Sequence, residues 1–205
     1  MPILLLIRHA ENDVLKTRIA GRMPGVHLNA KGYRQAQALA QSLADAPLTA
    51  IYSSPMERAL ETAAPLADRH HLEVQVHPDL IEVDYGRVQG RTYKQLGRTK
   101  LWKLVHEKPS AVQFPEGECM TAVMQRTVAT LESLVGHHAD NHVIACVTHG
   151  DLIRLAIVHY LGLPLDAYHS FSISTASVTV VALENGCARL LNINQVTSLE
   201  WPNKP

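Results

Sequence analysis

Cysteine is scarce in this 205-residue sequence, and neither sign of charge is in excess. The three cysteines, Cys119, Cys146 and Cys187, are far apart and odd in number, which argues against a disulfide framework and indicates a reducing compartment. We therefore expect a cytoplasmic protein. Nineteen basic residues balance nineteen acidic ones, so bulk charge favours neither nucleic acid nor an anionic membrane as a partner.

Long apolar runs are absent as well. The N-terminal run 3–7 is far shorter than the roughly 18 to 20 residues that a transmembrane helix needs, and no basic segment precedes it. We expect neither a transmembrane segment nor a signal peptide. The hydrophobic fraction of 46% is nevertheless ample for a sizeable core.

Internal repeats, low-complexity tracts and long linkers are also lacking, so nothing in the sequence marks a second full domain. Apolar runs alternate with amphipathic stretches, a pattern typical of a largely parallel sheet covered by helices. We predict a single domain over residues 1–205 with a small helical cap formed by about residues 91–118. Its fold class is α/β, with three layers, a mostly parallel sheet, helices on both faces and an antiparallel edge.

The individual elements are predicted from periodicity and from capping residues. Strands are expected at 3–7, 48–53 and 143–148, with shorter strand-like pieces at 74–76 and 80–83. One helix is expected to begin near Ala30 with Asn29 as its cap, and another at Pro55 with Ser54 as its cap. Further helices are expected over about 92–107 with a break at Gly97, over 118–136 and over 152–161. A β-hairpin around Asn185-Gly186 is predicted to form the sheet edge.

Four basic side chains follow the predicted parallel strands at their carboxyl ends. Arg8 and His9 end the first apolar run, Arg58 comes shortly after 48–53, and His149 follows 143–148. Because α/β sheets deliver functional groups at the carboxyl ends of their strands, these residues are expected to meet in one crevice. The sequence therefore predicts a strongly cationic pocket.

Such a pocket suits a phosphate ester. Two guanidiniums can bind a tetrahedral phosphate through paired hydrogen bonds, and the helix start after His149 adds backbone donors. A neutral imidazole nitrogen can attack phosphorus and carry the phosphoryl group. The leaving alkoxide then needs a proton, for which Glu82 is the first candidate, with Asp84 and Glu11 as nearby alternatives.

Histidine pairs elsewhere in the sequence do not indicate a metal site. His70-His71 and His137-His138 lie at predicted helix ends, with no cysteine or carboxylate at ligand spacing. We interpret them as solvated residues.

Several segments of the chain resemble a known family. They follow the family's order and spacing along nearly the whole sequence, and they are 6–11 (LIRHAE), 53–63 (SSPMERALETA), 80–86 (LIEVDYG), 114–118 (FPEGE) and 147–150 (VTHG). On these motifs the chain resembles the histidine phosphatase superfamily, which includes the cofactor-dependent phosphoglycerate mutases.

The resemblance implies a role for each matched residue. His9 would be the nucleophile that becomes a phosphohistidine, Arg8, Arg58 and His149 would bind phosphate, and Glu82 would be the general acid that later activates water. No metal and no other cofactor is implied, because the cationic shell supplies the charge stabilisation that a divalent ion gives in other phosphatases.

The sequence departs from the family pattern at two positions. The glycine that usually follows the Arg-His pair is Ala10, and the asparagine often found six residues after the nucleophile is Leu15. Asn12 and Thr17 are both candidates to take the place of that asparagine, and we include Asn12 among the expected phosphate ligands.

The resemblance also bears on the reaction. In the family that the chain resembles, mutases are longer and have an extended insertion after the segment that carries the acid. The corresponding residues 91–118 are compact in this sequence. This favours a phosphomonoester hydrolase that acts on a small phosphorylated metabolite, with broad specificity left open. The alternatives are a cofactor-dependent phosphoglycerate mutase and a catalytically silent phosphate-binding regulatory module. Segments 13–27 and 92–107, the second of which contains Tyr93 and Trp102, would select the leaving group. Edge strands near the C-terminus could support a homodimer, but the sequence does not decide the oligomeric state.

Overall fold

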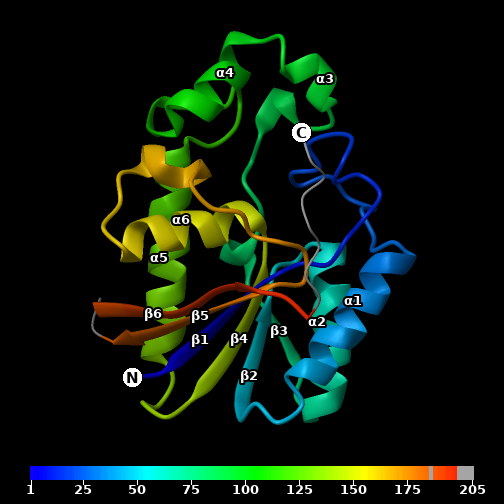
Figure 1. Ribbon diagram of the computed structural model, residues 1–205, viewed down its shortest axis with the longest axis vertical. Helices are drawn as coiled ribbons and strands as arrows, with labels where there is room; N and C mark the ends of the chain where they lie inside the picture. The colour runs from blue at the N-terminus through cyan, green and yellow to red at the C-terminus, as the bar shows by residue number, and fades with distance from the viewer. Residues whose placement is uncertain (185–186, 198–205) are drawn as a thin grey trace.

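The computed structural model describes residues 1–184 and 187–197, and within them it contains one six-stranded sheet (Figure 1). Its strands are β1 (Ile3–Arg8), β2 (Leu48–Ser53), β3 (Val74–Val76), β4 (Val143–Thr148), β5 (Val178–Glu184) and β6 (Cys187–Gln195). The spatial order is β3-β2-β4-β1-β5-β6. The first four strands in this order pair in parallel, and β5 and β6 add an antiparallel edge. The predicted α/β fold is confirmed.

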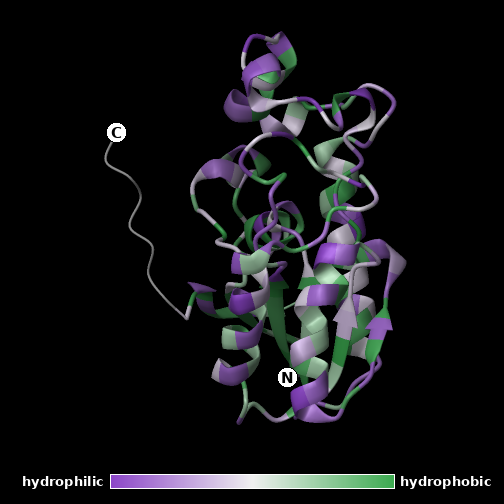
Figure 2. Cartoon of the chain, turned by 90° about the vertical axis from the view of Figure 1, so that its right-hand side faces the viewer, coloured by the Kyte–Doolittle hydropathy of each residue, from purple (hydrophilic) through white to green (hydrophobic). Residues whose placement is uncertain are grey.

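Helices cover both faces of the sheet because its central strands are apolar on consecutive residues. In β1, Leu4 and Leu6 pack in the cluster that includes residues of α5 (Met120–Gly136) and α6 (Gly150–Tyr160). Their neighbours Leu5 and Ile7 pack in the cluster on the opposite face, against α1 (Ala30–Ser42) and α2 (Glu57–His70). Figure 2 shows the hydrophobic strands enclosed between helices whose outer surfaces are polar.

A third apolar cluster extends the core beyond the sheet. It joins Leu152 of α6 to Val83 and Phe114 and to two short helices, α3 (Tyr93–Leu96) and α4 (Lys100–Glu107). These short helices lie at the end of the molecule beyond α6 (Figure 1). Segment 91–118 is therefore anchored to the main body by side-chain packing.

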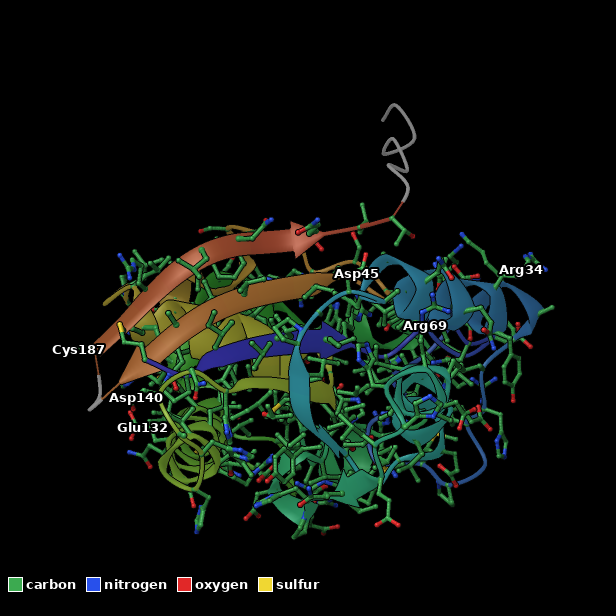
Figure 3. All side chains as sticks on the ribbon, turned by 90° about the horizontal axis from the view of Figure 1, so that it is seen from below. Arg34, Asp45, Arg69, Glu132, Asp140 and Cys187 are labelled. Carbon is green, nitrogen blue, oxygen red and sulfur yellow. The ribbon has the colours of Figure 1, made fainter. Side chains whose placement is uncertain are left out.

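Cysteine placement agrees with the sequence analysis. Cys146 is fully buried in β4, and the three cysteines are free thiols. Cys187 is exposed at the outer end of β6, as the view from below shows (Figure 3). Within the described residues, no helix combines the length and the apolar character needed to cross a membrane.

Two predictions about local structure were wrong. The helix after β2 begins at Glu57, with Met56 as its cap, and not at Pro55 with Ser54 as its cap. The Ser54 hydroxyl accepts from the Met56 amide at 3.3 Å, before the helix begins, and is also 2.8 Å from His149 Nε2, so a distant part of the chain helps to hold it. Residues 80–83 form no strand: a 3-10 turn, Pro78–Leu80, leads into an irregular segment.

The apolar character of 80–83 reflects burial without strand pairing. Leu80 and Val83 are both completely buried, in different apolar clusters. Elsewhere the predicted elements are confirmed, including Asn29 as the cap of α1 and the break between α3 and α4 after Gly97. The antiparallel pairing of β5 with β6 confirms the predicted hairpin strands, while its tip, Asn185-Gly186, lies outside the described residues.

Candidate active site

A cavity of about 190 Å³ opens where β1 and β4 end. Its wall is built by residues from the strand ends, from the loops that follow them and from the short helices above. The lining residues include Arg8, His9, Asn12, Leu15, Gly21, Arg58, Glu82, Tyr85, Tyr93, Trp102, Gly150, Asp151, Arg154 and Tyr168. Of the four basic residues expected to meet in one crevice, Arg8, His9 and Arg58 line this cavity, whereas His149 does not.

His9 lies on the cavity wall in a defined protonation state. The side chain is 3% exposed, and its Nδ1 is 2.8 Å from the carbonyl oxygen of Ala10. Because a carbonyl oxygen only accepts hydrogen bonds, Nδ1 carries the proton and Nε2 keeps its lone pair. Burial, followed by the positive charges of Arg58 and Arg8, lowers the pKa of His9 well below its usual value. The ring is therefore neutral at physiological pH and is suited to nucleophilic attack.

The loop after His9 is tied to α2. The Ala10 amide donates to the Thr62 hydroxyl at 2.9 Å, and that hydroxyl donates to the Arg58 carbonyl at 2.6 Å. Ala10 is fully buried and does not have a positive φ, so alanine fits where the family pattern has glycine.

Arg58 is 1% exposed, which is unusual for an arginine in the first turn of a helix. Its Nη2 donates to the Gly21 carbonyl at 2.8 Å and to His149 Nδ1 at 3.3 Å. Its Nε and Nη1 are buried and have no partner among the described residues. Burial lowers the pKa of Arg58, and the charge of Glu82 opposes that shift. The guanidinium is thus fixed on one side and has free donors on the other.

Arg8 and Asn12 repeat this arrangement. Nη1 of Arg8 donates to the Ile173 carbonyl, while its Nε is buried without a partner in the described chain. Asn12 Oδ1 accepts from the amides of Val14 and Leu15 at 3.1 and 3.0 Å, which fixes the orientation of the side-chain amide. Its Nδ2 is then a buried donor with no partner in the described chain.

These unpartnered donors identify what the cavity can bind. Leaving a buried N–H group unpaired costs about 1 to 3 kcal/mol, and more for a charged group. Among the described residues of the cavity wall, Arg8, Asn12 and Arg58 leave four such atoms, and Nε of Arg154 is a fifth. An oxyanion with several acceptors, such as a phosphate group, would satisfy the first four together.

Of the two residues considered in place of the family asparagine, Asn12 lines the cavity. Thr17 is exposed, and its hydroxyl donates to the Val14 carbonyl at 3.0 Å. Leu15, which occupies the position of the family asparagine, itself lies on the cavity wall.

Among the three candidate carboxylates, Glu82 lies on the cavity wall. It is 9% exposed, and its Oε1 accepts from the Val83 amide at 2.9 Å. Burial, followed by the negative charge of Asp151, raises the pKa of Glu82 to about 7, against the opposing charge of Arg58. The side chain is therefore able both to give and to take a proton near neutral pH.

The other two carboxylates are engaged elsewhere. Glu11 is 3.6 Å from Lys16 Nζ and 3.3 Å from Lys31 Nζ. Asp84 accepts from the Gly86 amide at 2.9 Å and lies 3.6 Å from Arg22 Nη1. Neither Glu11 nor Asp84 lines the cavity, and their contacts stabilise the loops around it.

His149 lies directly behind the cavity wall, with no exposed surface. Because Arg58 donates to its Nδ1, its Nε2 carries the proton and donates to the Ser54 hydroxyl at 2.8 Å. The rings of His149 and His9 are 5.3 Å apart in an edge-on arrangement. Burial, followed by the charge of Arg58, lowers the pKa of His149 well below its usual value.

Three residues of the site were missed by the sequence analysis. Asp151 and Arg154, in the first two turns of α6, line the cavity beside Gly150. Glu118, just before α5, accepts from the Asp84 amide, from Arg22 and from Arg126, so it holds the segment that carries Glu82. The three-residue spacing of Asp151 and Arg154 directly after His149 was a usable signal, because it places both on one side of the helix end.

Comparison with known proteins gives a consistent assignment. The sequence model described as the histidine phosphatase superfamily (branch 1) matches residues 4–196. Phosphoserine phosphatase 1 from Hydrogenobacter thermophilus is 31% identical over 199 residues, which cover 93% of this chain and 91% of that protein. The 2,3-bisphosphoglycerate-dependent phosphoglycerate mutase from Thermoplasma acidophilum is 31% identical, with 100% of this chain and 98% of that protein covered.

Solved structures show the same fold. The phosphoserine phosphatase of Entamoeba histolytica in complex with 3-phosphoglyceric acid has a TM-score of 0.85 and 26% identity, and the alignment covers 96% of this chain and 98% of that chain. Because a mutase matches over nearly its full length, chain length does not separate phosphatases from mutases among these relatives.

Proposed function

Because the chain belongs to the histidine phosphatase superfamily, we propose that it hydrolyses phosphomonoesters without a metal ion, through a phosphohistidine formed on His9. One observation carries this proposal. The buried donors without partners on Arg8, Asn12 and Arg58 surround the same cavity as the neutral His9 ring. A bound phosphate group would satisfy these donors and present its phosphorus atom to His9.

The reaction proceeds in two steps. In the first, His9 Nε2 attacks phosphorus, the bond between phosphorus and the ester oxygen breaks, and protonated Glu82 gives its proton to the leaving alkoxide. In the second, ionised Glu82 takes a proton from water, and the resulting hydroxide attacks the phosphohistidine. Inorganic phosphate leaves, His9 is restored and Glu82 is protonated again.

Arg8, Arg58 and Asn12 bind the phosphate directly, whereas His149, which was also expected among the phosphate ligands, has no exposed surface and supports the site indirectly. The two guanidiniums stabilise the charge on the transferring phosphoryl group, a task for which other enzymes use a divalent ion. His149 acts from behind the wall, where its ring receives a hydrogen bond from Arg58 and packs edge-on to His9. It thereby holds the nucleophile and one guanidinium in place.

The substrate we propose is a small phosphorylated metabolite. The cavity is small, at about 190 Å³, compared with the roughly 300 to 1,000 Å³ of sites for drug-sized ligands. We assign residues 91–118 as a cap, because Tyr93 and Trp102 of this segment line the cavity.

The free cysteines support a reducing compartment, and we propose that the protein is located in the cytoplasm.

The first test is hydrolysis of p-nitrophenyl phosphate in the presence of a metal chelator. We expect unchanged turnover with and without chelator, and no dependence on bisphosphoglycerate. Loss of activity on chelation would contradict metal independence. Rapid isomerisation of phosphoglycerate that requires a bisphosphoglycerate primer would favour the mutase. Tight binding of inorganic phosphate without turnover of any ester in a panel would favour a regulatory module.

A second test concerns the contact between Gly150 and Arg8. A Cβ atom added at Gly150 would lie 3.1 Å from Arg8 Nε and 3.3 Å from Arg8 Cδ, so the guanidinium would have to move. Because small displacements of a binding group are costly in catalysis, we expect Gly150→Ala to raise the KM for p-nitrophenyl phosphate about 10-fold. The inhibition constant of inorganic phosphate should rise in parallel.

The matched control is Gly136→Ala at the end of α5. There an added Cβ meets no atom of the described chain within 4 Å. We expect wild-type kinetics for this control and thermal melting close to wild type for both variants. Unchanged phosphate inhibition in Gly150→Ala would remove Arg8 from the proposed phosphate site.

A further inference from the structure

The start of α6 presents a further cationic group to the cavity, besides the proposed phosphate ligands Arg8, Arg58 and Asn12. Arg154 lines the cavity together with Asp151, and its side chain is 21% exposed. The proposed two-step reaction gives Arg154 no part. Because Arg154 lines the cavity, it can contact the part of a substrate that is not the phosphate group.

The Arg154 guanidinium is held rigidly. Its Nη1 donates to Asp151 Oδ1 at 3.1 Å and lies 3.5 Å from the Tyr168 hydroxyl. Its central carbon lies 5.3 Å from the centre of the Tyr168 ring, in a cation–π arrangement. Asp151 in turn accepts a hydrogen bond from the Tyr85 hydroxyl. The planar group is thus fixed in orientation before any ligand arrives.

Part of the guanidinium is left unsatisfied. Its Nε is buried and has no partner among the described residues, as is the case for Nε of Arg8 and of Arg58. The contacts with Asp151 and Tyr168 are both made by Nη1. Nε and the second terminal nitrogen form one edge of a guanidinium, and this edge matches the two oxygens of a carboxylate.

Arg154 also lies within electrostatic reach of Arg8. After burial, the positive charge of Arg154 is the largest influence that lowers the pKa of Arg8. Both arginines line the same cavity with a buried Nε that has no partner among the described residues, so an anion in the cavity can be attracted by both charges. A phosphate ester bound at Arg8 therefore has its leaving group within reach of Arg154 when that leaving group is short.

The charge balance favours a single negative charge at this position. Asp151 compensates one positive charge on Arg154, and Glu82 adds a further acidic group to the same wall. A second phosphate would bring about two negative charges against these carboxylates, whereas a carboxylate brings one. The small cavity also restricts the leaving group to a few carbon atoms beside the phosphate.

We propose that Arg154 is a specificity-determining residue that binds a carboxylate on the leaving group, so that phosphate esters of small hydroxy acids are the preferred substrates. This inference rests on the proposed phosphatase activity and deepens it. A phosphoglycerate and a phosphorylated hydroxy amino acid both carry a phosphate ester and a carboxylate, so both fit this proposal. The amino acid ester also carries an ammonium group, which the phosphoglycerate lacks. Asp151, the carboxylate paired with Arg154, is the acidic group that can bind it.

The test compares two substrates of similar size that differ in the carboxylate, 3-phosphoglycerate and glycerol 3-phosphate. The readout is the ratio of their kcat/KM values, which cancels a general effect on turnover. We expect the ratio to favour 3-phosphoglycerate at least 10-fold in the wild type and to fall about 10- to 100-fold in Arg154→Gln, the range for loss of a charged hydrogen-bonded pair. Arg154→Lys, which keeps the charge but not the planar fork, should give an intermediate ratio.

O-phosphoserine serves as the second carboxylate substrate. We expect its kcat/KM relative to glycerol 3-phosphate to fall with that of 3-phosphoglycerate in Arg154→Gln. A preference for O-phosphoserine over 3-phosphoglycerate that disappears in Asp151→Asn identifies the amino acid ester as the source of the carboxylate. Equal values for the two in the wild type identify the carboxylate alone as the recognised group.

The control is Arg69→Gln on the exposed last turn of α2 (Figure 3), a residue that does not line the cavity. Its substrate ratio should equal that of the wild type. If Arg154→Gln melts at a much lower temperature, the double variant Asp151→Asn/Arg154→Gln, which leaves no unpaired carboxylate, replaces it. A ratio that stays unchanged in the Arg154 variants overturns the inference, as does a wild type that hydrolyses all three esters equally well. Failure of the wild type to hydrolyse any ester overturns the proposed function instead.

Discussion

Replacement of His9 by alanine is expected to lower kcat/KM for every phosphate ester by at least about a thousand-fold, the scale of nucleophile loss in enzymes that use covalent intermediates. The reason is that no other neutral imidazole lines the described part of the cavity, since His149 is completely buried behind the wall. The loss should appear in kcat as well as in kcat/KM, because the bond to phosphorus cannot form.

The covalent intermediate gives the most direct measurement. Wild-type protein quenched in alkali during turnover should carry one phosphoryl group on His9, detected by mass spectrometry of the peptides, and acid treatment should remove it. His9→Ala should carry none. His159→Ala, at the exposed end of α6, is the matched control and should keep both activity and the label. A His9→Ala protein that still turns over esters at a normal rate would show that the phosphohistidine mechanism is wrong.

The pocket could be predicted from the sequence because its parts follow from local rules. Arg8 and His149 end apolar runs that are long enough to be buried strands, and parallel strands bring their carboxyl ends together. The helix that carries Arg58 follows β2 by the same rule. Sequence order alone therefore predicted the convergence of these residues, without knowledge of any distance.

Other features depended on contacts between distant parts of the chain. Ser54 looked like a helix cap, but its hydroxyl is bound to His149, 95 residues away. The apolar residues Leu80 and Val83 looked like part of a strand, yet each is buried by a different cluster. A short apolar run does not distinguish pairing from burial, because both need the same side chains.

Arg154 shows a third limit. An arginine on an amphipathic helix is usually a solvated charge. Its spacing from Asp151 indicates a shared side of the helix, but the position of the cavity and the unpartnered Nε are what place Arg154 in the site. The replacement for the family asparagine was ambiguous for a similar reason. Asn12 and Thr17 both lie within one turn of chain from Leu15, so sequence position did not decide between them, and the structure separates them by burial.

Glu82→Gln is expected to slow the first step by about 10²- to 10⁴-fold for alkyl phosphates, the usual contribution of general acid catalysis. For p-nitrophenyl phosphate the loss should be much smaller, because nitrophenolate leaves without a proton. This dependence on the leaving group distinguishes an acid from a residue that only shapes the site. Glu132→Gln, at the exposed surface of α5 (Figure 3), is the matched control and should show no such dependence.

The pH dependence of the two steps follows from the pKa of Glu82, which burial and the charge of Asp151 raise to about 7. Phosphorylation of His9 needs the protonated acid, so its rate should fall as pH rises above about 7. Dephosphorylation needs the ionised base, so its rate should rise through the same range. Rapid-quench measurement of the two steps in the wild type should show these opposite trends. Both trends should be lost in Glu82→Gln, and pH profiles that are the same in wild type and variant would exclude Glu82 as the proton donor.

The same shift has a consequence for stability. Because the folded pKa of Glu82 is about 7 and the unfolded value is 4.5, the folded protein binds the extra proton between these values, and its free energy of unfolding falls as pH rises. At 1.36 kcal/mol per pKa unit, the full contribution is about 3 kcal/mol, present below pH 4.5 and lost above pH 7. Glutamine is neutral at every pH and does not carry this cost. Chemical denaturation should therefore show Glu82→Gln to be more stable than the wild type at pH 8 and close to it at pH 5, so a residue that disables catalysis when replaced is also one that destabilises the fold when ionised.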